Sequence, residues 1–147
     1  MRREALAPAS GIDHSSAHVT SELWCISLDP INIDNKFARF SEHWRPKRIA
    51  RLNGQEVKLA KVKGVFPWHR HETAEEMFLV WHGRLFVDYR DRRVELGPGE
   101  MTVVPRGVEH RTAADEETLI LIFEPAGIRN TGDVDSPEFT APQGVEL

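Results

Sequence analysis

The segment FPWHRHETAEEMFLVWHG, residues 66–83, carries an H-x-H pair, His69 and His71, and a glutamate, Glu76, at the start of an apolar run. Side chains two residues apart on a strand point to the same face, so the two imidazoles would lie side by side. Polar side chains inside apolar strands are destabilising unless something pairs them. Two imidazoles and a carboxylate that converge on an interior would make a first-row metal site chemically reasonable.

A further histidine, His110, follows the segment MTVVPRGVE. A strand ending at Pro105 and a turn at Gly107 would return His110 to the same interior. The H-x-H pair alone leaves ligation and a structural role evenly balanced. The pair combined with a spaced glutamate, a glycine and a distant histidine favours a metal site. A lone histidine is more commonly solvated or hydrogen-bonded, and we interpret three others in that way: His14, His18 and His43.

Short β-rich segments, cut by glycine or proline, follow one another from residue 47 onwards. They read KRIARLNG, QEVKLAKVKG, EMFLVWHG, RLFVDYRD, RRVELGPGE, MTVVPRG and ETLILIFEPAG. Strands at such close and regular spacing predict an all-β domain, a barrel or a sandwich. The sequence contains no internal repeat, so we expect one barrel.

The two ends of the chain carry weaker signals. We interpret residues 1–33 as an N-terminal arm with a possible strand over 22–28, residues 34–127 as the barrel, and residues 128–147 as a C-terminal tail that is extended and only partly ordered. Phe37 and Phe40 lie three residues apart, which predicts a short amphipathic helix or turn.

The composition excludes several classes of protein. A net charge of −4 argues against a nucleic-acid partner, for which a basic stripe would be expected. The single cysteine, Cys25, permits no intramolecular disulfide. The first residues lack the apolar core of a signal peptide, and no apolar run approaches the length of a membrane span. We therefore expect a cytoplasmic protein with no membrane partner.

The histidine-bearing segments resemble the two signature motifs of the cupin superfamily. The first motif, G-x5-H-x-H-x3,4-E-x6-G, is matched by Gly64, His69, His71, Glu76 and Gly83, although four residues instead of five separate Gly64 from His69.

The second motif, G-x5-P-x-G-x2-H-x3-N, is matched by Gly99, Pro105, Gly107 and His110, and Ala114 stands where asparagine is usual. The resemblance runs from about Phe37 to Asp133. Over this range the sequence is similar to the small single-domain cupins often described as mannose-6-phosphate isomerase-like.

This resemblance implies a single jelly-roll barrel, also called a double-stranded β-helix. It also implies one divalent metal ion held by His69, His71, Glu76 and His110. Such a ligand set suits zinc, manganese, iron or nickel. It leaves open positions on the metal, as in a catalytic site, because structural zinc sites are usually rich in thiolates.

Three functions remain open from the sequence. The first is a metal-dependent isomerase or epimerase that acts on a small polar substrate, namely a sugar, a sugar phosphate or an oxo-acid, with the metal polarising a carbonyl or hydroxyl group. This reaction also needs a general base, which the sequence does not identify. The second is a non-haem iron dioxygenase with the same ligands. The third is a non-enzymatic module that binds metal or ligand.

Three cations are candidate ligand-binding residues. The strand QEVKLAKVK carries Lys58 on one face and Lys61 on the other, so one of them should point inward. A lysine at a strand end that reaches solvent is the competing interpretation. Arg106, beside the proline of the second motif, could guard the mouth of the pocket. We expect the small-molecule ligand to be anionic or polyhydroxylated and to chelate the metal through two oxygens.

The strand EMFLVWH is bulky on both faces. Glu76, Phe78 and Val80 share one face, and Met77, Leu79 and Trp81 share the other. If the first face lines the barrel interior, the second is too apolar to be left in water. We therefore expect a homodimer, with part of this outer face covered instead by the chain's own segment 22–28 or by an outer sheet.

Overall fold

The computed structural model describes residues 27–147, and the barrel belongs to the compact unit Ile31–Leu147. Most of the predicted N-terminal arm lies outside the described residues. The same holds for the possible strand over 22–28, of which only Ser27 and Leu28 are described, and neither is in a strand.

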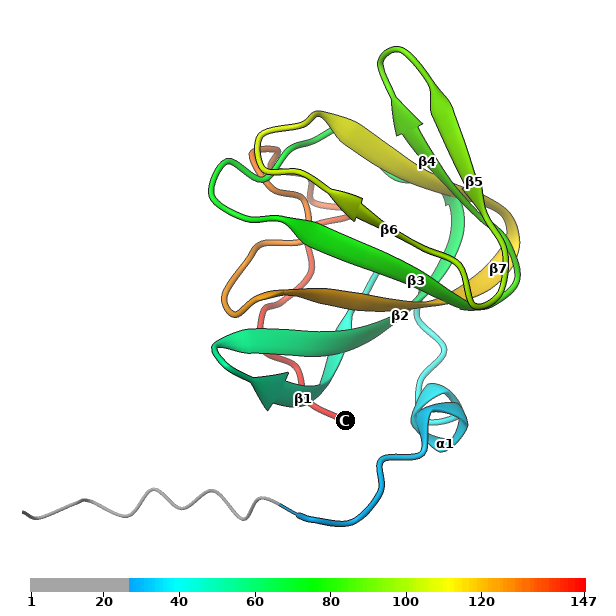
Figure 1. Cartoon of the computed structure of the whole chain (residues 1–147), viewed down its shortest axis with the longest axis vertical. Coiled ribbons are helices and arrows are strands. Elements are labelled where there is room, and N and C mark those ends of the chain that lie inside the picture. Colours follow the sequence, from blue (N-terminus) through cyan, green and yellow to red (C-terminus); the bar gives the residue numbers. More distant parts are fainter. Residues whose placement is uncertain (1–26) are drawn as a thin grey trace, which may run out of the picture. The chain divides into compact units, whose positions relative to one another are not determined.

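The compact unit is nearly all β, and its strands form an antiparallel barrel of the jelly-roll type, as predicted (Figure 1). The elements within residues 27–147 are α1 (Ile33–Phe37), β1 (Lys47–Leu52), β2 (Gln55–Val65), β3 (Glu76–His82), β4 (Leu85–Tyr89), β5 (Arg93–Leu96), β6 (Met101–Val104) and β7 (His110–Pro125).

The long strand β7 connects the two halves of the barrel. The strand order is β1-β2-β7-β3-β6, and β7 also pairs with β4, which pairs with β5 (Figure 1). The sequence pattern predicted only the second half of β7, from Glu117 onwards. Its first half was missed because Asp115, Glu116 and Glu117 interrupt the apolar alternation, and these exposed acids lie where β7 leaves β4.

The barrel interior is filled by alternate residues of its strands. On β3, Phe78 and Val80 point inward and are buried, while Leu79 is only half-buried. They pack against inward-facing residues of the other strands, among them Val62, Leu85, Val87, Leu96, Val104, Ile120 and Ile122. Full burial of each such side chain stabilises the fold by about 1.5–3 kcal/mol, which makes this core the main source of stability.

A second, smaller core lies on the outer face of the sheet. Phe37 and Phe40 are buried there against Leu59 of β2. The predicted helix or turn is a five-residue helix that ends at Phe37, followed by a turn that leads to Phe40. The helix begins after Asn32, whose side chain accepts a hydrogen bond from the amide of Asn35 at 2.9 Å.

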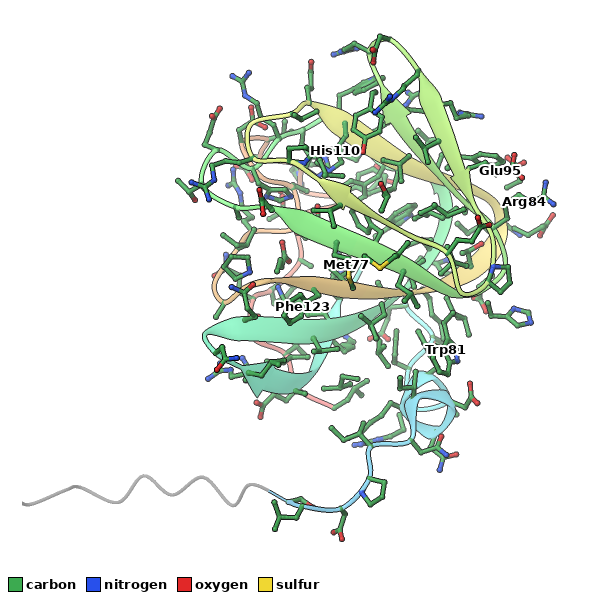
Figure 2. The ribbon with its side chains drawn as sticks, viewed as in Figure 1. Met77, Trp81, Arg84, Glu95, His110 and Phe123 are labelled. Atoms are coloured by element: carbon green, nitrogen blue, oxygen red, sulfur yellow. The ribbon has the colours of Figure 1, made fainter. Side chains whose placement is uncertain are left out.

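The outer faces of β3, β6 and β7 remain partly exposed beside that helix. Met77 pairs with Val103 on one side and with Phe123 on the other, and Figure 2 shows Met77 and Phe123 on the same side of the molecule. Trp81 donates to Asp34 of α1 at 2.7 Å and remains 39% exposed. Alternation on β3 therefore puts the two faces where the sequence pattern placed them.

Residues 128–147 pack against the barrel, in contrast to the expectation of a partly ordered tail. Thr131 and Ala141 are buried. The chain end runs beside the edge strand β1 (Figure 1): the amide of Arg48 donates to the Val145 carbonyl at 2.7 Å, and the amide of Leu147 donates back to Arg48 at 3.1 Å. An edge strand offers unpaired backbone groups, which this segment satisfies. No helix within residues 27–147 is long and apolar enough to cross a bilayer.

Candidate metal centre

Two strand starts and one backbone bridge bring the four predicted ligands together. Glu76 is the first residue of β3 and points inward with Phe78. His110 is the first residue of β7, and its backbone forms an isolated antiparallel bridge with that of His69. His71 follows on the same face as His69. The side chain of His110 lies inside the barrel (Figure 2).

The ligand atoms of these four side chains lie within 4.8 Å of one another. Oε2 of Glu76 is 3.1 Å from Nε2 of His71 and 3.4 Å from Nε2 of His110. All four residues are buried, and His110 is fully so. The cluster could therefore hold a metal ion, at the positions that the two motifs indicated.

The hydrogen bonds around the cluster leave its metal-facing atoms without partners. Nδ1 of His69 donates to the carbonyl of Pro67 at 2.9 Å, and Nδ1 of His110 donates to that of Val108 at 2.9 Å. Each ring is thereby oriented with Nε2 towards the cluster, which is the usual arrangement of a metal-binding histidine. Among residues 27–147, no hydrogen-bond partner serves the buried Nε2 of His71, Nε2 of His110 or Oε2 of Glu76. Buried polar atoms are rarely left unpaired, so this donor set fits a cation.

Burial and mutual interaction set the charges of the cluster. Burial, assisted by the neighbouring His110, lowers the pKa of His69 to about 4, so this imidazole is neutral at neutral pH. Burial also acts to lower the pKa of His71, but the Glu76 carboxylate outweighs it and raises this pKa overall. Burial opposes ionisation of Glu76, yet His110 and His71 outweigh it and hold the pKa of Glu76 at about 2. Glu76 thus supplies a carboxylate and His69 a neutral imidazole, the forms that bind metals.

The remaining motif residues hold the backbone around the ligands. The amide of Gly107 in the second motif donates to the carbonyl of His71 at 2.9 Å. Gly83 ends the first motif at φ +94°, and a Cβ there would lie 2.7 Å from Oγ1 of Thr118, so only glycine fits. Ala114, in the position usually held by asparagine, is buried in the barrel core.

A small pocket adjoins the cluster. The volume open to the centre of a water molecule in this pocket is about 30 Å³, which leaves room for only a small group. His69 and Glu76 form one part of its wall, and Thr112 and Asn130 contribute further polar groups. The rest of the wall is mostly apolar and includes Ala60, Val62, Phe66, Phe78, Ile120 and Ile122.

None of the three candidate ligand-binding cations lines this pocket. Lys58 does point inward, but its Nζ contacts Glu124 at 2.9 Å and Glu56 at 3.3 Å. Lys61 lies on the other face of β2, with Nζ 5.4 Å from the centre of the Phe40 ring. Arg106 is exposed in the turn of the second motif. A role for these residues in ligand binding stays a prediction.

Glu124 is a buried acid that the sequence reasoning missed. It pairs with Glu56 across β2 and β7, and because Met77 pairs with Phe123, it lies beside Glu76 across β3 and β7. Its Oε1 accepts from Lys58, whereas its buried Oε2 has no hydrogen-bond partner among residues 27–147. Burial, followed by the negative charge of Glu76, raises the pKa of Glu124 to about 7. The sequence did contain evidence for its burial, because alternation along the strand puts Glu124 on the same inward face as Ile120 and Ile122.

Known proteins share this fold. Residues 55–123 match the family model described as "Cupin domain". A cupin-2 domain containing protein from Shewanella frigidimarina has 46% sequence identity and a TM-score of 0.64, over 65% of this chain and 93% of that one. Protein NMB1881 from Neisseria meningitidis has 29% identity and a TM-score of 0.62, over 67% of this chain and 100% of that one.

A curated relative extends the comparison. The uncharacterized protein YdbB of Bacillus subtilis is 31% identical over 93 residues, which cover 63% of this chain and 76% of YdbB. A small antiparallel barrel with a buried His-His-Glu-His cluster defines the class of protein. The chain belongs to the cupin family.

Proposed function

We propose that the protein is a metal-dependent cupin in which His69, His71, Glu76 and His110 hold one divalent cation and a small molecule binds in the adjoining pocket. The observation that carries the proposal is the convergence of four buried ligand atoms within 4.8 Å, three of them without hydrogen-bond partners among residues 27–147. The ligand set suits zinc, manganese, iron or nickel.

The proposed reaction is a non-redox one of the isomerase or epimerase type on a small oxygenated substrate: a sugar, a sugar phosphate or an oxo-acid. A bound cation of this kind supplies Lewis-acid polarisation of a substrate oxygen. The protein's own groups orient the ligands, through the Nδ1 contacts of His69 and His110, and exclude water through the apolar wall. Mannose-6-phosphate isomerase-like chemistry is one member of this class.

Two alternatives each have an observation in their favour. A non-haem iron dioxygenase is favoured by the apolar pocket wall, which suits an apolar substrate better than a sugar. A non-enzymatic binding module is favoured by the lack of a free general base. Among the described lining residues, the only titratable ones are His69 and Glu76, and both belong to the cluster.

Metal analysis tests the proposal most directly. Protein purified without added metal, or reconstituted after chelation, should contain about one divalent ion per chain. His71→Ala and His110→Ala should empty or weaken the site. His43→Ala is the matched control, because His43 contacts Glu117 at the surface, away from the cluster. Full metal content in both ligand variants would refute the ligand assignment.

The identity of the metal then separates the candidate reactions. Iron together with substrate-dependent oxygen uptake would select the dioxygenase. Zinc or manganese without oxygen uptake would select the non-redox reaction. A loaded protein that binds ligands tightly but returns them unchanged would select the binding module.

A further inference from the structure

We infer that the ligand of this site has one small oxygen-bearing head, carrying at most a single negative charge, and an uncharged apolar body, as in a branched-chain 2-oxo-acid. This inference rests on the proposed metal site and deepens it by choosing among the substrate classes given above. It disfavours sugar phosphates and dicarboxylates.

The first support is the lack of free polar groups in the pocket wall. Among the polar lining residues, His69 and Glu76 are engaged at the metal cluster. Both polar atoms of the Asn130 side chain already form hydrogen bonds. Its Nδ2 donates to the Phe139 carbonyl at 2.8 Å, and its Oδ1 accepts from the backbone amide of Ala141 at 2.9 Å. The indole Nε1 of Trp44 donates to the Lys63 carbonyl at 3.0 Å, so among the described lining side chains only Thr112 is left to meet a ligand hydroxyl. A polyhydroxylated ligand would bury several hydroxyls without partners, each at a cost of about 1–3 kcal/mol.

The second support is the apolar wall itself. Val62, Phe78 and Ile120 are buried and face the pocket from three different strands, so a ligand body beyond the head meets carbon atoms on several sides. The space is small, which limits this body to a few carbon atoms. Apolar atoms gain free energy on entering such a site, whereas a second charged group loses its hydration there.

The third support is the charge of the barrel interior. A divalent cation and the Glu76 carboxylate together leave one positive charge, which a single carboxylate on the ligand would balance. A second negative charge would find no cation among residues 27–147, because Lys58 is held by Glu124 and Glu56 and no described lysine or arginine lines the pocket. The acids Glu56 and Glu124 occupy the same inner face as Glu76, and they would repel a second negative charge on the ligand.

The test compares three 2-oxo-acids that share one head and differ in their body, with a sugar phosphate as the fourth compound. Metal-loaded protein is titrated calorimetrically with pyruvate, 3-methyl-2-oxobutanoate, 2-oxoglutarate and mannose 6-phosphate. The two additional carbon atoms of 3-methyl-2-oxobutanoate should improve binding about 15-fold over pyruvate, at roughly fourfold per buried carbon. The other two compounds, which carry a second charge, should bind more weakly than pyruvate.

Val62→Thr provides a nearly isosteric change in the pocket wall. It should remove most of the advantage of 3-methyl-2-oxobutanoate over pyruvate and leave pyruvate binding unchanged. Val57→Thr is its matched control, because Val57 lies on the opposite face of the same strand and does not line the pocket. This variant should behave as the wild type with all four compounds.

The outcomes separate this inference from the proposed function. If 2-oxoglutarate or mannose 6-phosphate binds metal-loaded protein as tightly as 3-methyl-2-oxobutanoate, or if no compound binds, the inference is overturned while the metal site stands. Equal loss of binding in Val62→Thr and Val57→Thr would also overturn it. Protein that takes up no divalent cation would refute the proposed function, and the inference with it.

Discussion

His69 and His110 are joined to each other through their backbones. The amide of His69 donates to the carbonyl of His110 at 3.0 Å, and the amide of His110 donates to the carbonyl of His69 at 2.9 Å. The two imidazole rings lie with their centres 4.4 Å apart. Because the bridge uses only main-chain atoms, the protein fixes the spacing of two candidate metal-ligand positions independently of the side chains that occupy them.

Metal affinity should fall as the pH is lowered through the pKa of His71. In the metal-free protein Glu76 raises this pKa, so His71 gains a proton that a metal ion must displace, and acid favours the protonated form. His69, with a pKa of about 4, remains neutral over most of this range. Calorimetric zinc titrations between about pH 8 and about pH 5 would measure the effect. Affinity that does not change with pH would contradict it, and His43→Ala should leave the profile unaltered.

Gly132→Ala should loosen the metal centre from outside the barrel. Gly132 has φ +54°, and a Cβ there would overlap the carbonyl of Arg70, the residue between His69 and His71. Accommodation of the methyl group must push that segment away. We expect lower metal affinity together with a loss of stability, measured by zinc titration and urea unfolding.

Gly127→Ala is the control for that substitution. Gly127 also has a positive φ, +79°, but a Cβ there would meet nothing within 4 Å. It should show only the backbone cost of the left-handed conformation, about 1–2 kcal/mol, with unchanged metal affinity. Equal effects of the two substitutions on zinc binding would argue against the contact with Arg70.

Lys58→Met should destabilise the barrel strongly, because it leaves Glu124 buried without its cation. Removal of one partner of a buried ion pair typically costs about 3–5 kcal/mol. The measurement should be made near pH 8, above the pKa of about 7 that burial and Glu76 give Glu124. Urea unfolding monitored by tryptophan fluorescence gives the free energy of unfolding.

Two further variants test whether the ion pair causes the loss of stability. Lys58→Met combined with Glu124→Leu should recover most of the loss, because Glu56 keeps Arg48 at 2.8 Å. Lys63→Met removes an exposed contact with Glu116 and should change stability by less than about 1 kcal/mol. A double variant no more stable than Lys58→Met would show that the ion pair is not the cause.

Dimer formation remains a proposal that rests on the outer sheet face. Its half-exposed residues carry no charge: Met77, Leu79, Trp81, Met101 and Val103. Exposed apolar patches usually mark interfaces, and sedimentation at low micromolar concentration should reveal a dimer. Val103→Lys should shift the monomer–dimer equilibrium towards the monomer. Val65→Lys, at a similarly exposed valine outside this face, should not. A wild-type monomer would refute the dimer.

The sequence by itself determined most of the strands and the candidate ligands. Alternation along EMFLVWH groups Glu76 with Phe78 and Val80 on one face, because side chains on a strand alternate by geometry alone. The spacing of His69 and His71 follows the same rule. The position of His110 was predictable because a proline and a glycine terminate β6 and force a turn. Local patterns of this kind need no knowledge of what lies across the barrel.

Only the tertiary structure decided which groups meet across strands. Nothing in the local sequence indicates that Glu124 would hold Lys58, because their contact depends on the register between β2 and β7. Nor does it indicate that Gly132 would press against Arg70, since the segment 128–147 has no strand pattern and acquires its order from the barrel edge it covers. The charge and apolar character of the pocket arise from long-range pairings of this kind, which form only when the chain is folded.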